Sequence, residues 1–237
     1  MNELLTGMGI ILLYAGVLAA AAVALRVFTP IRDEVYRKML HMIMVIATMF
    51  WPYLFEHWYI ASAASVICIV LFYVLLAAAE RFIDLTRFMT ERRKGEFMTS
   101  VVLAFFMYAV VIAVCWGWRG ERILTVAVVS AWGYGDAAAA LVGKRFGRHG
   151  IEGRHIEGRK SVEGSAAMFG TSFVCVLTVL LVRGGMAWYG CVLTALITAL
   201  AAAVTELYSL DGRDTITCPF AAMACLLPLT WLFGRAA

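Results

Sequence analysis

The sequence predicts an all-α protein, a polytopic membrane helix bundle of about eight transmembrane helices. Its 237 residues are 63% hydrophobic and only 15% charged, whereas soluble domains are about 45–50% apolar. The apolar residues also form long runs, roughly eight of them near the length of about 20 residues that crosses a bilayer. A larger soluble core would not require such runs, so we expect the chain to be embedded in a membrane.

The runs are expected to be helices, because lipid cannot satisfy the polar groups of an open backbone. The first run lacks a preceding basic segment, so we interpret it as a spanning helix rather than a cleavable signal. No linker or low-complexity segment divides the chain, which favours one integral membrane catalytic domain over residues 1–237. The expected spans are 4–25, 39–55, 58–80, 98–116, 123–143, 164–182, 187–207 and 219–233.

Basic residues predict the orientation. Sixteen Lys and Arg fall in the four loops on one side of these spans and four on the other side. The positive-inside rule then places the sixteen in the cytoplasm and both termini outside. We expect a bacterial inner (plasma) membrane protein. Thirteen of the sixteen acidic residues lie on or near the same side, which the rule does not explain and a cytoplasmic active site would.

Six cysteines are present, without a CxxC pair or a Cys/His cluster at zinc spacing. This pattern argues against a zinc site and favours small buried apolar side chains.

Asp136 is the most informative residue, because it lies inside the fifth expected span, in AWGYGDAAAALVGK. If that helix ends near Gly143, Asp136 lies about 10 Å inside it. An ionisable group at such depth is costly and marks a functional candidate. Its face of the helix carries small residues, Gly133, Ala139 and Ala140. Such a face serves either close helix packing or a cleft in which a ligand or metal reaches Asp136.

The next segment, GKRFGRHGIEGRHIEGRKSVEG, is rich in glycine and basic residues. It is either an ordinary basic loop or a loop that presents N–H groups and cations to phosphates. It is not a Walker loop, because Arg159 precedes Lys160 and Ser161 and no strand comes before it. Ser161 can cap the next helix, whose N-terminus would attract an anion. The candidate phosphate-binding residues here are Gly143, Lys144, Arg145, Gly147, Arg159, Lys160, Ser161 and Gly164.

Two further clusters are expected on the same side. Arg37, Lys38 and His41 share one helical face at three- and four-residue spacing. Glu206 ends the seventh span and is followed by SLDGRDTITCP, which carries Asp211 and Asp214. Carboxylates for a divalent metal, cations for phosphates and a membrane-embedded cleft together indicate phosphoryl or nucleotidyl transfer from a nucleotide to a lipid.

The ordered pieces resemble the family of polyprenol and dolichol kinases, phytol kinases and CTP-dependent diacylglycerol kinases. The resemblance covers nearly the whole chain, from RKMLH to DTITCP. The matching pieces are Arg37-Lys38-x-x-His41, Gly95 after a basic loop, Gly135-Asp136-x-x-Ala139-x-x-x-Gly143, Lys160-Ser161-x-Glu163-Gly164-Ser165, and Glu206 with Gly212-x-Asp214 and Pro219. Family members often have Asp-Asn where this chain has Asp214-Thr215.

The resemblance implies a Mg²⁺-dependent kinase that transfers phosphate from a nucleoside triphosphate, CTP or ATP, to a membrane lipid alcohol. Polyprenol, phytol and diacylglycerol are the candidate acceptors. The implied catalytic residues are Asp136, Glu163 and His41; Asp136, Glu206 and Asp214 are the metal candidates; Arg37 and Lys38 join the nucleotide-binding set. A homo-oligomer is compatible with the sequence, and no nucleic-acid partner is expected.

Three other functions remain as alternatives. Phosphatidate cytidylyltransferases share the Lys-Ser/Thr-x-Glu-Gly element, but they usually carry another Asp about ten residues before Gly-Asp, and here no acid lies between Glu121 and Asp136. A small-solute transporter would favour internal repeats and polar groups near the midplane. An intramembrane aspartyl protease, suggested by GYGD, needs a second carboxylate close to Asp136, and no second Asp is expected inside a span.

Overall fold

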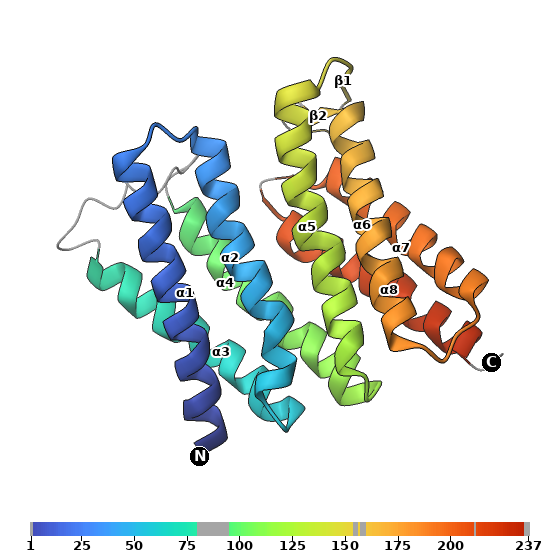
Figure 1. Ribbon diagram of the computed structural model, residues 1–237, viewed down its shortest axis with the longest axis horizontal. Helices are drawn as coiled ribbons and strands as arrows, with labels where there is room; N and C mark the ends of the chain where they lie inside the picture. Colours follow the sequence, from blue (N-terminus) through green and yellow to red (C-terminus); the bar gives the residue numbers. More distant parts are fainter. Residues whose placement is uncertain (1, 80–94, 154–155, 157–159, 211, 235–237) are drawn as a thin grey trace.

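The computed structural model describes residues 2–79, 95–153, 156, 160–210 and 212–234, and Figure 1 shows them as a bundle of long helices. A π-helical segment, Ile112–Trp118, continues the fourth helix. The described helices are α1 (Asn2–Phe28), α2 (Asp33–Leu54), α3 (Trp58–Ala79), α4 (Glu96–Val111), α5 (Arg122–Phe146), α6 (Val162–Arg183), α7 (Trp188–Tyr208) and α8 (Asp214–Gly234).

Seven of these helical segments are long and apolar enough to cross a membrane. The expected all-α, polytopic bundle is confirmed, and the protein is an integral membrane protein. The remaining expected span, 39–55, corresponds to α2. This helix is 22 residues long but is less apolar than the other seven segments. Four charged residues in its first two turns account for the difference: Asp33, Glu34, Arg37 and Lys38.

Helix α5 lies at the centre of the bundle, between α2 on one side and α6 on the other (Figure 1). Glycines allow both neighbours to approach closely. A Cβ atom at Gly133 would lie 2.5 Å from the Val45 side chain of α2, and one at Gly135 would lie 2.5 Å from the Ser172 hydroxyl of α6. Gly133, one of the predicted small residues, and Gly135 beside Asp136 therefore serve close helix packing.

Most helix boundaries differ from expectation by one or more residues, and three of these differences matter for the site. Helix α2 begins at Asp33 instead of residue 39, since acidic residues suit the positive end of the helix dipole. Helix α5 continues to Phe146, with Lys144 and Arg145 in its last turn, where cations are favoured. Helix α8 begins at Asp214 instead of residue 219 and includes Pro219.

A short hairpin joins α5 to α6. Its strands, β1 (Gly150–Ile151) and β2 (Lys160–Ser161), are antiparallel, with Gly150 opposite Ser161 and Ile151 opposite Lys160. The Ser161 hydroxyl accepts a hydrogen bond from the Gly164 N–H at 3.2 Å, which confirms the expected N-cap of α6. The end of the bundle where α5 ends and α6 begins is called the basic end below.

We predict that the two ends of the bundle lie on opposite sides of the membrane. Glu56 and Arg148 are both exposed, Glu56 between α2 and α3 and Arg148 beyond the end of α5. In a variant without native cysteines, Glu56→Cys and Arg148→Cys should react with an impermeant thiol reagent from opposite sides, with position 148 cytoplasmic according to the positive-inside rule. Reaction of both positions from one side would contradict this arrangement.

Candidate functional site

The carboxylate of Asp136 forms a buried ion pair with a lysine of another helix. Lys38 Nζ of α2 lies 2.5 Å from Asp136 Oδ2, and the two side chains are only 8% and 13% exposed. His41 Nε2 lies 3.5 Å from the same oxygen. Asp136 Oδ1 makes no hydrogen bond or ion pair to any described residue. One carboxylate oxygen is thus held by α2, and the other stays available to a ligand.

The hydrogen bonding of His41 defines its tautomer. His41 Nε2 lies 3.1 Å from the carbonyl oxygen of Gly133. A carbonyl oxygen can only accept a hydrogen bond, so Nε2 carries the proton and donates it. Nε2 therefore cannot act as a base in this arrangement. Its bond to α5 fixes the imidazole beside Asp136, which favours a positioning role for the residue that the resemblance implied to be catalytic.

Trp132 is a site neighbour that the sequence analysis overlooked. It lies four residues before Asp136, so a large side chain stands on the helix face that was interpreted as small. Its ring is edge-on to that of His41, with centroids 5.1 Å apart. The indole N–H is buried without a hydrogen-bond partner among the described residues. Buried donors are seldom left unpaired, so this one needs an acceptor such as water or a ligand.

A second ion pair joins the hairpin to α7. Lys160 Nζ donates to Glu206 Oε1 at 2.7 Å and also to the backbone carbonyl of Glu206. Both side chains are mostly buried, 19% and 12% exposed. Asp214, at the start of α8, lies close enough to interact electrostatically with Asp136, Lys38, Lys160 and Glu206. The structure therefore brings together five of the predicted charged residues, from α2, α5, β2, α7 and α8.

A third group of charged residues lies at the basic end, between α2 and α5. Glu34 binds Lys144 of α5 and also Arg37, whose Nη2 lies 2.6 Å from Glu34 Oε1. The Glu34 side chain is 12% exposed, although Lys144 is 58% exposed. Glu34 was not predicted as a site residue, because it precedes the expected span 39–55. Its spacing of four residues to Lys38 was the available signal that both share one helix face.

The glycine-rich segment is packed more tightly than a phosphate-binding loop would be. Gly143, Lys144 and Arg145 are helical rather than loop residues, and the Gly147 N–H donates to the Gly143 carbonyl at 3.0 Å. A Cβ at Gly164 would lie 3.0 Å from a backbone oxygen of α5. Gly143, Gly147 and Gly164 thus lie at the contact between α5 and the start of α6, and phosphate binding by the remainder of the segment stays a prediction.

Other predicted residues have local partners. Glu163 lies 2.7 Å from His149 Nδ1 in the neighbouring loop, and Arg145 lies over the Phe146 ring at 5.3 Å. Both assignments stay predictions, since the described contacts of these residues lie apart from Asp136. Arg159 and Asp211 fall outside the described residues.

The three proposed metal carboxylates do not form a closed cage. Among the described residues, only Glu3, Glu56 and His57 bring three candidate ligand atoms within 4.8 Å of one another. Asp136, Glu206 and Asp214 do not form such a group among the described residues, so their joint binding of one ion stays a prediction. Mg²⁺ usually takes only one or two carboxylates, with phosphates and water completing its octahedron. A site of this kind would need only Asp136 Oδ1 and one further carboxylate from the protein.

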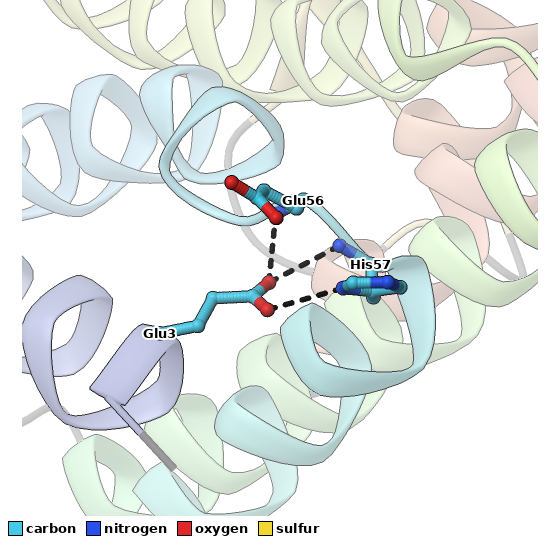
Figure 2. A group of neighbouring side chains, drawn as sticks. All are labelled: Glu3, Glu56 and His57. Carbon is cyan, nitrogen blue, oxygen red and sulfur yellow. Dashed lines mark hydrogen bonds and ion pairs between the residues drawn. The ribbon is translucent and has the colours of Figure 1, made fainter.

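The Glu3 group lies at the opposite end of the bundle and has a structural explanation. In Figure 2 the Glu3 carboxylate faces the backbone N–H groups of Glu56 and His57 and the imidazole of His57. The distances are 2.7 Å, 3.1 Å and 3.1 Å, respectively. These N–H groups precede α3, so Glu3 satisfies donors that no helical carbonyl can reach. The contact joins α1 to the start of α3.

Fold and site together define an integral membrane helix bundle with two mostly buried ion pairs near its basic end. No protein-family model, no curated protein and no solved structure matches the chain. The functional interpretation therefore depends on the residues themselves and their geometry.

We predict that Lys38 and Asp136 are energetically coupled. Removing one partner of a buried pair leaves an uncompensated charge, which typically costs about 3–5 kcal/mol. Lys38→Met should therefore lower thermal stability in detergent strongly, and Lys38→Met combined with Asp136→Asn should recover much of the loss. Asp136→Asn alone should lower thermal stability less than Lys38→Met, because Lys38 still interacts with Asp214. Additive effects of the two single changes would contradict the pairing.

Proposed function

We propose that the protein is a Mg²⁺-dependent kinase that transfers the γ-phosphate of a nucleoside triphosphate, CTP in the first instance, to the hydroxyl of a membrane lipid alcohol. The observation that carries the proposal is the buried Lys38–Asp136 pair within a membrane-embedded bundle, with Lys160, Glu206 and Asp214 nearby. Ionisable groups at such depth are costly and usually functional. We place this site at the cytoplasmic face, where the nucleotide is found.

Asp136 has two possible roles in the transfer, and its geometry is compatible with both. Lys38 holds Oδ2, so Oδ1 can either coordinate a metal ion or accept the proton of the lipid hydroxyl. In the transfer, the lipid oxygen forms a bond to the γ-phosphorus while the bond from that phosphorus to the β-phosphate oxygen breaks. The hydroxyl proton passes to Asp136 or to water, and the nucleoside diphosphate leaves.

Cations near the basic end are suited to the phosphates. The Lys160 ammonium has three donors, of which two bind Glu206. The third can bind a phosphate oxygen without loss of the ion pair. Arg37 and Lys144, which meet at Glu34, are candidates for the outer phosphates or the base. Mg²⁺, when bound with the nucleotide, would neutralise phosphate charge during transfer.

The proximity of Asp136 and Asp214 also bears on the aspartyl-protease alternative. Helix α8 starts at Asp214, so a second aspartate does lie at a span, contrary to expectation. A protease dyad shares one proton between two carboxylates. Here Lys38 already pairs with Asp136, and both Lys38 and Lys160 interact with Asp214. Lys38 stabilises the ionised form of Asp136 through this ion pair, which favours phosphate chemistry over a proton shared by the two aspartates.

One labelling experiment separates the main candidates. Purified protein is incubated with total lipid extract and with CTP labelled at either the α- or the γ-phosphate. Label from the γ position in the lipid is expected for the kinase. Label from the α position would instead identify a phosphatidate cytidylyltransferase, and absence of label from CTP and from ATP would leave non-enzymatic functions such as solute transport.

We predict that Lys160→Ala raises the KM for the nucleotide far more than the KM for the lipid. Hydrogen bonds to charged groups contribute roughly 1.5–3 kcal/mol, so the increase should be about 10- to 150-fold. Arg148→Ala is the matched control, because Arg148 is an exposed cation of the same connection and should leave both constants unchanged. An unchanged nucleotide KM in Lys160→Ala would remove Lys160 from the site.

We predict that Asp136→Asn lowers turnover at least about 100-fold. Loss of charge stabilisation in the transition state costs several kcal/mol, and each factor of ten corresponds to about 1.4 kcal/mol. The measurement is lipid phosphorylation across a Mg²⁺ titration, with thermal unfolding as the control for folding. Recovery at high Mg²⁺ would identify a metal ligand, and no recovery would favour the base. Near-normal turnover would contradict either role.

A further inference from the structure

A groove opens between α2 and α5 on the membrane-facing side of the candidate site. Its volume is about 510 Å³, within the range of about 300–1,000 Å³ that is typical of small-molecule sites. Phe50 and Tyr53 at its rim are 62% and 56% exposed. In a bilayer these surfaces face hydrocarbon, not water. The lining residues are Ile46, Met49, Phe50 and Tyr53 of α2 with Val126 and Tyr134 of α5.

The groove adjoins the Asp136 cluster through the contact between the same two helices. The Gly133 carbonyl accepts the hydrogen bond from His41, and the Cα of Gly133 packs against Val45. The next residue on each helix, Tyr134 and Ile46, lines the groove. The groove therefore begins next to this helix contact, and the polar cluster of Asp136 and His41 adjoins the same contact.

The length of the groove and the chemistry of its walls indicate one kind of ligand. Val126 and Tyr134 are eight residues apart on α5, so the groove extends along about 12 Å of that helix. Its walls are aliphatic, aromatic and thioether groups, with two tyrosine hydroxyls as the polar atoms of the side chains. Methionine and aromatic side chains adapt to flexible apolar ligands. A site of this kind binds a hydrocarbon chain and has nothing to pair with a charged group.

We propose that this groove binds the hydrocarbon chain of the acceptor lipid, so that its terminal hydroxyl reaches Asp136 from within the bilayer. This inference depends on the proposed kinase function for the identity of the headgroup, but the binding of the chain can be tested separately. The lipid then enters sideways between α2 and α5, while the nucleotide arrives from the basic end. Acceptor and donor meet at Asp136 from perpendicular directions.

Photolabelling tests the binding of the chain without requiring phosphoryl transfer. The probe is a long-chain prenyl alcohol with a diazirine in its chain, in vesicles of neutral phospholipid. We expect cross-links within residues 46–53 and 126–134, which are lost when unlabelled prenyl alcohol is added. Ile46→Phe and Met49→Phe fill the groove and should each reduce labelling at least about tenfold, since displacement of about two methylenes is sufficient.

Val174→Phe is the matched control. Val174 is 60% exposed on α6 and does not line the groove, so this change should leave labelling intact. In kinetics, the groove variants should raise the KM for the long-chain alcohol and leave the nucleotide KM and the activity toward a short, soluble alcohol unchanged.

The outcomes separate this inference from the proposed function. Specific labelling without any phosphorylation would support the groove and overturn the kinase. Phosphorylation with unaltered constants in both groove variants would support the kinase and overturn the groove. Labelling that phospholipid alone displaces would mean that a bulk bilayer lipid occupies the groove, which also overturns the inference.

Discussion

The buried ion pair between Lys38 and Asp136 constrains most of this structure. Neither charge is tolerable alone inside a membrane-spanning bundle, so α2 and α5 must meet with these two residues in register. The bond from His41 to the Gly133 carbonyl and the contact of Gly133 with Val45 extend the same register along the helices. Helix α2 is accordingly the least apolar of the long helices, because its charged turns face partners rather than lipid.

Much of the architecture could be predicted from the sequence, because apolar runs in lipid have few alternatives to helices. The boundaries that went wrong share a physical cause. Residues 33–38 are too polar to be recognised as part of a span, yet Glu34 and Lys38 find partners on α5 that are more than 90 residues away in sequence. The last span was expected to begin at residue 219, but the helix already begins at Asp214. Ion pairs between residues so far apart in sequence cannot be predicted from the local sequence pattern.

The candidate site was predicted in composition but not in arrangement. Asp136 was recognised as a costly residue inside a span, and Lys38, Lys160, Glu206 and Asp214 as candidates for phosphate or metal binding. Two ion pairs and the electrostatic interactions of Asp214 link these five residues. The glycines were more ambiguous, because a small residue serves an open cleft and a close helix contact equally well in sequence. Gly135 and Gly164 turn out to be filled by the neighbouring helix. Trp132 could have been predicted as a neighbour of Asp136, because it precedes that residue by four positions on the same helix.

The charge balance of the cluster suggests why a cation and a nucleotide would bind together. Two lysines face three carboxylates, so the five side chains carry a formal net charge of −1 when all are ionised. Each lysine is already paired, and a bare triphosphate would meet carboxylates as well as ammonium groups. A divalent ion that arrives with the nucleotide reverses this balance, since it is attracted by the excess carboxylate and screens the phosphates at once. In the proposed kinase, the affinity for the nucleotide or for Mg²⁺ alone should then be low, because each lysine already has a carboxylate partner.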